Sequence, residues 1–78
     1  MSPSPVPFPE AKMIRIVLNG ESRLVPDGLN VMELLINVGV DPERVAVELN
    51  RRLVKSERYD QPLKAGDEVE IVTFVGGG

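Results

Sequence analysis

Cysteine and histidine are both absent from this chain of 78 residues. Histidine is the commonest general base and cysteine supplies the thiol nucleophile, so most self-contained enzyme mechanisms are excluded. The same absence removes the usual ligands of zinc and iron-sulfur clusters and excludes a disulfide-stapled secreted protein. A chain of this size buries only about 60% of its unfolded surface, which leaves little room for a deep pocket. We therefore expect no enzyme, no bound cofactor and no metal.

Positive charge and long apolar runs are also scarce. Nine Lys and Arg stand against 12 Asp and Glu, giving a net charge of -3, the opposite of the sign that nucleic-acid backbones select. There is no run of about 18 apolar residues, and the first residues lack the charged-then-apolar order of a signal peptide. We expect a cytoplasmic protein that binds neither nucleic acid nor a membrane.

Proline is concentrated at the start, where residues 1–12 hold four of the seven prolines. Because proline fixes φ and lacks a backbone donor, we expect residues 1–12 to form an extended, poorly ordered extension. A ligand for a proline-recognition domain is the alternative function of this stretch. Regular patterning begins at Met13, so the folded domain is predicted over residues 13–78.

The first regular pattern is that of a β-hairpin. Residues 13–18, MIRIVL, are rich in β-branched residues and place Ile14, Ile16 and Leu18 on one face. Asn19 and Gly20 readily take the two positive φ values of a type I′ turn. The pattern therefore predicts an antiparallel return strand over residues 21–25.

A helix is predicted next, because Asn30 stands three residues before Glu33, which is the spacing of a capping box. The helix should begin at residue 31 and end before Gly39, which suits the left-handed stop position. Apolar residues recur at i, i+3, i+4 and i+7 and predict a stripe that faces the core. The stripe consists of Val31, Leu34, Leu35 and Val38.

The second half of the chain predicts further strands. Residues 45–50 alternate and predict a half-buried strand, whereas residues 51–62 have no clean period and predict a short strand or turn-like connection. Residues 68–75, EVEIVTFV, give the strongest strand signal. This order of elements predicts an α+β domain with one helix packed across one face of a mixed sheet.

Three consecutive glycines, Gly76, Gly77 and Gly78, follow the last predicted strand directly. Glycine lacks a Cβ atom, so enclosing residues can approach its backbone and a nucleophile can reach the carbonyl of Gly78. Adenylation with ATP would give the Gly78 carboxylate a good leaving group, and sulfur could then displace AMP to leave a thiocarboxylate. On this hypothesis the chain is a substrate of another enzyme; a frayed end or an engineered linker is the alternative.

These segments together resemble the ThiS family, the sulfur carriers of thiamine biosynthesis. The resemblance rests on the Asn-Gly turn, the PDG turn before the capped helix, AVELN, and AGDEVEIVTFVGGG at the end. It covers residues 13–78 and is most specific over residues 70–78, whereas the proline-rich residues 1–12 depart from the usual family member. It implies a ubiquitin-like β-grasp fold with the first and last strands adjacent and parallel at the sheet centre.

The resemblance also implies a function. A ThiF-type activating enzyme would use ATP to adenylate Gly78, and the resulting thiocarboxylate would donate sulfur to thiazole synthase (ThiG-type) for the thiazole ring. Gly76 and Gly77 would thread the channels of these partners. MoaD, the small subunit of molybdopterin synthase, is the nearest alternative, although TFVGGG resembles ThiS more. A ubiquitin-like conjugating modifier or a β-grasp binding module, such as a regulatory or RNA-associated domain, is the remaining alternative.

Two exposed side chains are predicted beside the glycines. If Val69 and Ile71 face the helix, then Val72 and Phe74 fall on the opposite face of the sheet. Exposed apolar clusters often mark partner surfaces, so Val72 and Phe74 are predicted to dock on the activating enzyme. Cover by the local chain is the alternative.

Two charged clusters complete the candidates. The basic one consists of Arg51, Arg52, Lys55 and Arg58. It favours a solvated loop, with contact to an acidic partner or a phosphate as the alternative. The acidic one consists of Asp67, Glu68 and Glu70. It is predicted either to complement a basic enzyme surface or to form a solvated edge.

Overall fold

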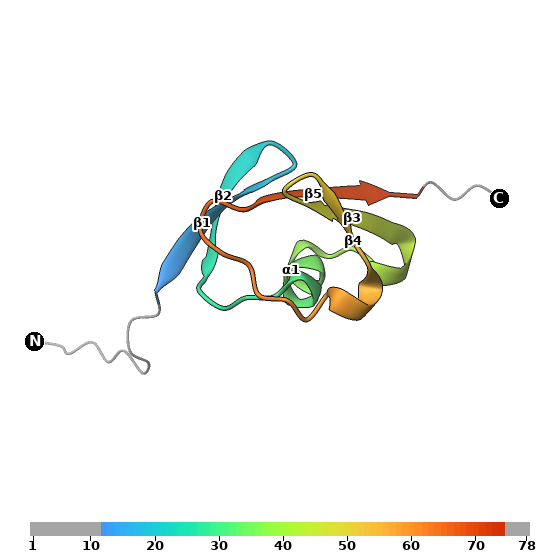
Figure 1. Ribbon diagram of the computed structural model, residues 1–78, viewed down its shortest axis with the longest axis horizontal. Helices are drawn as coiled ribbons and strands as arrows, with labels where there is room; N and C mark the ends of the chain where they lie inside the picture. Colours follow the sequence, from blue (N-terminus) through green and yellow to red (C-terminus); the bar gives the residue numbers. More distant parts are fainter. Residues whose placement is uncertain (1–11, 75–78) are drawn as a thin grey trace, which may run out of the picture.

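Within residues 12–74, five strands form one mixed sheet in the order β2-β1-β5-β3-β4, with a single α-helix across one face (Figure 1). The structure is a computed structural model, and it describes residues 12–74. The predicted extension, apart from Lys12, and the three glycines therefore lie outside the described residues. The elements are β1 (Met13–Leu18), β2 (Glu21–Pro26), α1 (Val31–Val38), β3 (Val45–Leu49), β4 (Arg52–Val54) and β5 (Glu68–Thr73), with short 3-10 turns η1 (Pro42–Arg44) and η2 (Ser56–Arg58).

The hairpin and the helix form as predicted. Asn19 and Gly20 have φ values of 48° and 84°, which the type I′ turn requires, and β2 runs one residue further than expected. At the start of α1 the Glu33 amide donates to Asn30 Oδ1 at 2.8 Å, and the Asn30 amide donates to Glu33 Oε1 at 2.9 Å. Gly39 ends the helix at a φ of 91°. Both hydrogen bonds of the predicted capping box, and the predicted stop at Gly39, are thus confirmed.

Strand β5 occupies the middle of the sheet. It pairs in parallel with β1 through Val17↔Glu68 and Leu18↔Val69, and antiparallel with β3 from Leu49↔Val69 to Val45↔Thr73. This confirms the placement of the first and last strands that the family resemblance implied. The strand that leads toward the glycines is therefore held by neighbours on both sides.

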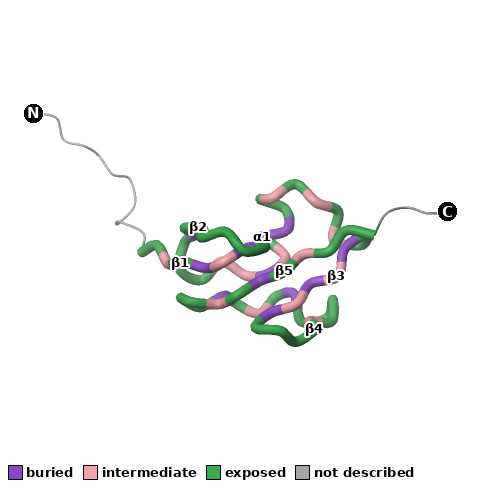
Figure 2. The backbone as a smooth tube through the Cα atoms, turned by 90° about the horizontal axis from the view of Figure 1, so that it is seen from above, coloured by how far each residue is buried: buried purple, intermediate pink, exposed green. Residues whose placement is uncertain are grey.

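The core lies between α1 and the sheet, and its buried residues gather on the central strands and the inner side of the helix (Figure 2). The predicted helix stripe is confirmed, with Val31, Leu34 and Leu35 fully buried and Val38 partly buried. The segment that had no clean period, residues 51–62, contributes the core residue Tyr59, and Leu63 directly after it is also buried. Isolated apolar residues on an irregular segment produce no repeating pattern in the sequence, because elements distant in the sequence bury them.

Two further strand ends, besides that of β2, differ slightly from the predicted ranges. Strand β3 stops at Leu49, because Asn50 and Arg51 take positive φ values of 52° and 69° in the turn to β4. Strand β5 stops at Thr73 instead of residue 75. Residue 75 lies outside the described part of the chain, and Phe74 continues the path of β5 without being part of it.

Candidate functional site

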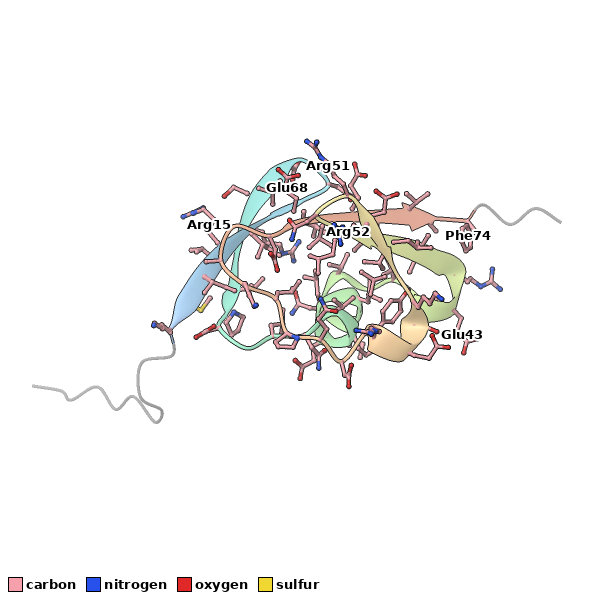
Figure 3. The ribbon with its side chains drawn as sticks, viewed as in Figure 1. Arg15, Glu43, Arg51, Arg52, Glu68 and Phe74 are labelled. Atoms are coloured by element: carbon pink, nitrogen blue, oxygen red, sulfur yellow. The ribbon has the colours of Figure 1, made fainter. Side chains whose placement is uncertain are left out.

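The base of the glycine tail is anchored by the sheet. Thr73 pairs with Val45, and the Phe74 amide then donates to the Arg44 carbonyl at 2.8 Å. Hydrogen bonding to the adjacent segment of the same chain thus extends one residue past β5, to Phe74, the fourth residue before Gly78. Figure 3 shows Phe74 at the far end of β5. A partner that receives the glycines would therefore find them attached to a fixed point.

Two apolar side chains stand exposed at this base. The exposed fractions of Val72 and Phe74 are 55% and 57%, whereas Val69 is buried and Ile71 is half-buried. Val72 pairs with Ala46 of β3, so it lies on the side of the sheet away from α1. The expectation that Val72 and Phe74 stay out of the core is confirmed, and their role in docking remains a prediction.

The structure separates the three residues of the predicted acidic cluster. Asp67 is hydrogen bonded within the chain. Its carboxylate accepts hydrogen bonds from the side chain of Asn50 at 3.0 Å and from the Lys64 amide at 2.8 Å. Glu68 instead faces solvent beside Arg51, with Nε and Oε1 3.8 Å apart (Figure 3). Asp67 therefore fixes the turn before β5, and only the other two acids are available to a partner.

Glu70 has a neighbour that sequence reasoning missed. It pairs directly with Glu48 across β5 and β3, which places two carboxylates side by side on the outer face of the sheet. Glu68, two residues before Glu70, shares that face. We call Glu48, Glu68 and Glu70 the acidic strip. The alternation of residues 45–50 marks Glu48 as outward-facing, but its opposition to Glu70 depends on strand register.

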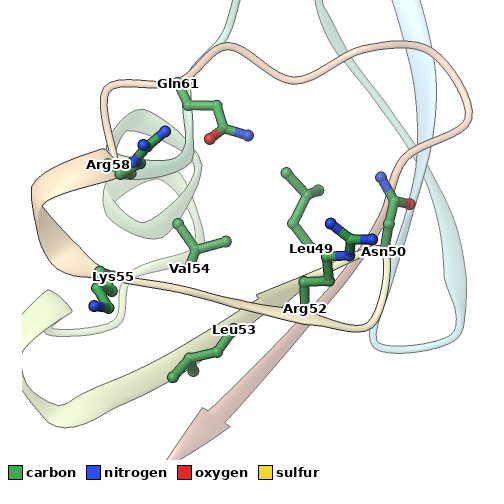
Figure 4. A pocket seen from close by; sticks show the side chains of 8 residues that line it. All are labelled: Leu49, Asn50, Arg52, Leu53, Val54, Lys55, Arg58 and Gln61. Atoms are coloured by element: carbon green, nitrogen blue, oxygen red, sulfur yellow. The ribbon is translucent and has the colours of Figure 1, made fainter.

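The predicted basic cluster also divides. Arg51 lies beside Glu68 on the outer face, whereas Arg52, Lys55 and Arg58 line a hollow between β4 and the segment after η2 (Figure 4). All three of these cations are exposed, as the prediction of a solvated loop requires. The hollow itself had no signature in the sequence, because β4 and residues 58–61 meet only through the fold.

The sequence of the whole domain matches a known family. The profile of the ThiS family matches residues 11–78 of the 78 residues. The chain belongs to the ThiS family. Together with the five-stranded mixed sheet and its single helix, this match establishes the ubiquitin-like β-grasp fold.

Individual relatives agree with this assignment to the ThiS family. A protein of Thermus thermophilus named sulfur carrier protein ThiS is 42% identical over 62 residues, which cover 78% of this chain and 95% of that protein. The crystal structure of the thiamine biosynthesis protein ThiS from Geobacter metallireducens superposes with a TM-score of 0.72. The two sequences are 38% identical, and the superposition covers 83% of this chain and 100% of the Geobacter metallireducens protein.

Other relatives of this ThiS-family chain are much longer proteins. The thiazole synthases of Paramagnetospirillum magneticum and Magnetococcus marinus are 42% and 39% identical over 66 residues. Each match covers 83% of this chain but 20% of the relative. The chain thus spans about one fifth of the length of these two thiazole synthases.

Within residues 12–74, no group of three or more acidic, His or Cys side chains is placed to hold a metal ion. Among the same residues no helix is both long enough and apolar enough to cross a membrane.

Proposed function

We propose that this chain is a sulfur carrier of thiamine biosynthesis, which acts as a protein substrate and not as a catalyst. The family match and the name of the Thermus thermophilus relative support this function. The structural observation that carries it is the anchoring of β5, whose hydrogen bonding continues to Phe74, two residues before the first glycine. Gly78 is the residue that carries sulfur.

The chemistry at Gly78 requires two steps on a partner enzyme. An oxygen of the Gly78 α-carboxylate attacks the α-phosphate of ATP, and pyrophosphate leaves, which gives an acyl adenylate. A sulfur nucleophile at the oxidation level of hydrosulfide then attacks the carbonyl carbon, and AMP leaves with the bridging oxygen. The product is a thiocarboxylate. The partner supplies the nucleotide site and the nucleophile, since this chain contains neither Cys nor His.

The anchored strand explains how the carboxylate could reach such a partner. Four residues follow Phe74, and an extended chain spans at most about 3.3 to 3.6 Å per residue, so Gly78 lies within about 14 Å of Phe74. Gly76 and Gly77 have no side chains, which suits passage through a narrow channel. A short reach from a fixed base reduces the conformational entropy lost when the tail is bound.

A ThiF-type adenylating enzyme and a ThiG-type thiazole synthase are the proposed partners. The thiazole synthase relatives support the second partner, because each of those longer proteins contains a segment similar to this chain. For the adenylating enzyme, Val72 and Phe74 are the proposed contact, since both are exposed and apolar beside the tail. The acidic strip would guide the approach of a basic surface.

The mass of the intact protein tests this proposal. The chain is incubated with ATP, a sulfur source and the adenylating enzyme from a thiamine pathway, and its mass is then measured. Conversion should raise the mass by the difference between one sulfur and one oxygen atom. A matched variant with one alanine added after Gly78 should not react, because its terminal carboxylate no longer belongs to Gly78. Equal conversion of both proteins, or no conversion with an enzyme that modifies its own carrier, would contradict the proposal.

A further inference from the structure

The hollow under the edge strand β4 has the composition of an anion site. Its lining includes the cations Arg52, Lys55 and Arg58 together with Gln61, and its volume is about 620 Å³. Figure 4 shows Arg52 on one side of this hollow and Arg58 and Gln61 on the other. Arg52 belongs to β4 and Arg58 to η2, and Lys55 lies between these two elements, so a stretch of seven residues supplies all three cations.

These cations lack partners within the described chain. Arg44 and Arg51 each lie within 4.0 Å of a carboxylate, but no carboxylate among residues 12–74 lies that close to Arg52, Lys55 or Arg58. Residues 51–58 contain four cations and one acid, in a chain whose net charge is -3. The hollow is therefore a local site of positive charge on an acidic protein, and like charges gathered there repel one another until an anion is bound.

Apolar residues on the floor of the hollow strengthen the attraction between these cations and a bound anion. Arg52 pairs with Leu49 across β4 and β3, so its side chain leaves the sheet on the side of the core. Leu49 is buried and Val54 is half-buried, and both line the hollow. Ion pairs beside apolar surface are screened less than ion pairs in open water. An anion held there gains more from each cation than an anion on a flat surface.

We propose that this hollow binds a phosphate-bearing small molecule. Arginine forks and a lysine ammonium are the side chains that proteins use for phosphate, and the amide of Gln61 adds a neutral donor. Nucleic acid is disfavoured, because Tyr59 is buried and offers no stacking surface there. The hollow lies on the opposite side of the sheet from Val72, so it is separate from the proposed docking surface.

An NMR titration of the whole chain with inorganic pyrophosphate tests the site, with sodium chloride adjusted to hold the ionic strength constant. Saturable shifts should appear in the backbone amides of residues 52–61. The double variant Arg52→Gln/Arg58→Gln should weaken binding by about tenfold or more, because two of the three charged donors are lost. Its matched control is Arg15→Gln/Arg23→Gln, which removes the same charge from β1 and β2 and should change the affinity by less than about twofold.

Several outcomes would overturn the proposal. Linear, unsaturated shifts, or equal losses in the two double variants, would mean that the hollow adds nothing to general charge attraction. Tighter binding of triglutamate than of pyrophosphate would assign the hollow to an acidic protein partner. Binding to phosphatidylglycerol vesicles without binding of pyrophosphate would assign it to a lipid surface. Should the double variant fail to fold, Lys55→Gln alone should still weaken pyrophosphate binding, and unchanged affinity there would equally refute the site.

Discussion

The side-chain amide of Asn19 hydrogen bonds both backbone groups of Ile71. The Ile71 amide donates to Asn19 Oδ1 at 2.7 Å, and Asn19 Nδ2 donates to the Ile71 carbonyl at 3.3 Å. The parallel pairing of β1 with β5 ends at Leu18↔Val69, where the backbone turns away into the hairpin. The side-chain amide of Asn19 thus makes the two hydrogen bonds to the backbone of Ile71 that a further residue of β1 would make with its own backbone. One residue serves both the hairpin turn and the strand that leads to the tail.

Substitutions of Asn19 should separate these two roles. Asn19→Gly keeps the positive φ of the turn and loses both side-chain hydrogen bonds, so it should lower the free energy of unfolding by about 1 kcal/mol. Asn19→Ala should cost about 1 to 2 kcal/mol more, because alanine is strained at a φ of 48°. Urea denaturation measures both values.

Hydrogen exchange at Ile71 provides the control for this interpretation. The Ile71 amide should exchange faster in both variants, since each lacks the Oδ1 acceptor, while Asn19→Asp should retain most of the protection. Native-like exchange of Ile71 in Asn19→Gly would show that the side-chain contact does not hold β5.

Leu35 and Ile36 are neighbours in α1 with opposite burial, which makes them a matched pair. Leu35 is fully buried, whereas 65% of Ile36 is exposed. Leu35→Ala should cost about 2 to 5 kcal/mol of stability through lost burial and a cavity, and Ile36→Ala should stay within about 0.5 kcal/mol. Urea denaturation of both variants measures the difference.

A milder substitution keeps this comparison measurable in a small domain. Leu35→Met preserves side-chain volume and should cost less than about 1.5 kcal/mol. Equal costs for Leu35→Ala and Ile36→Ala would contradict the packing of α1 against the sheet.

The sequence predicted local features well and spatial neighbours poorly. The caps of α1 and the turn at Asn19 depend on residues a few positions apart, so their chemistry is visible in the sequence. The opposition of Glu48 to Glu70, and the hollow below Arg52, depend on which strands become neighbours and in what register. Tyr59 escaped prediction for the same reason, because its burial is decided by elements distant in sequence. The position of β5 beside β1 came from family resemblance and not from any pattern in the chain.

Phe74 should matter for recognition and not for stability. It is exposed and follows the last residue of β5, so Phe74→Ala should leave the urea midpoint almost unchanged. If Phe74 is a central anchor of the interface, its truncation should cost more than 1 kcal/mol, so kcat/KM for adenylation should fall by about tenfold. The release of AMP or pyrophosphate by the adenylating enzyme, with this chain as substrate, gives the rate.

The control for Phe74 is Ile36→Ala, which removes an apolar side chain of similar exposure from α1. This variant should be adenylated at the native rate, because it leaves the base of the tail intact. A similar loss in both variants would point to a general effect of surface hydrophobicity and would remove Phe74 from the interface.

The acidic strip should lower stability while it speeds association. Like charges directly opposite each other in a sheet are destabilising, so Glu70→Gln should stabilise the fold by a few tenths of a kcal/mol by removing its repulsion with Glu48. If the strip guides a basic partner, the same substitution should slow association with the adenylating enzyme at low salt, and the difference should vanish at high salt.

Glu57→Gln makes the same change in net charge outside the strip, in η2, and should alter neither stability nor association rate appreciably. Stopped-flow association rates at several salt concentrations provide the measurement. A stabilised Glu70→Gln variant that associates at the native rate would leave the strip without a role in recognition, because the repulsion between Glu48 and Glu70 would then bring no advantage in binding.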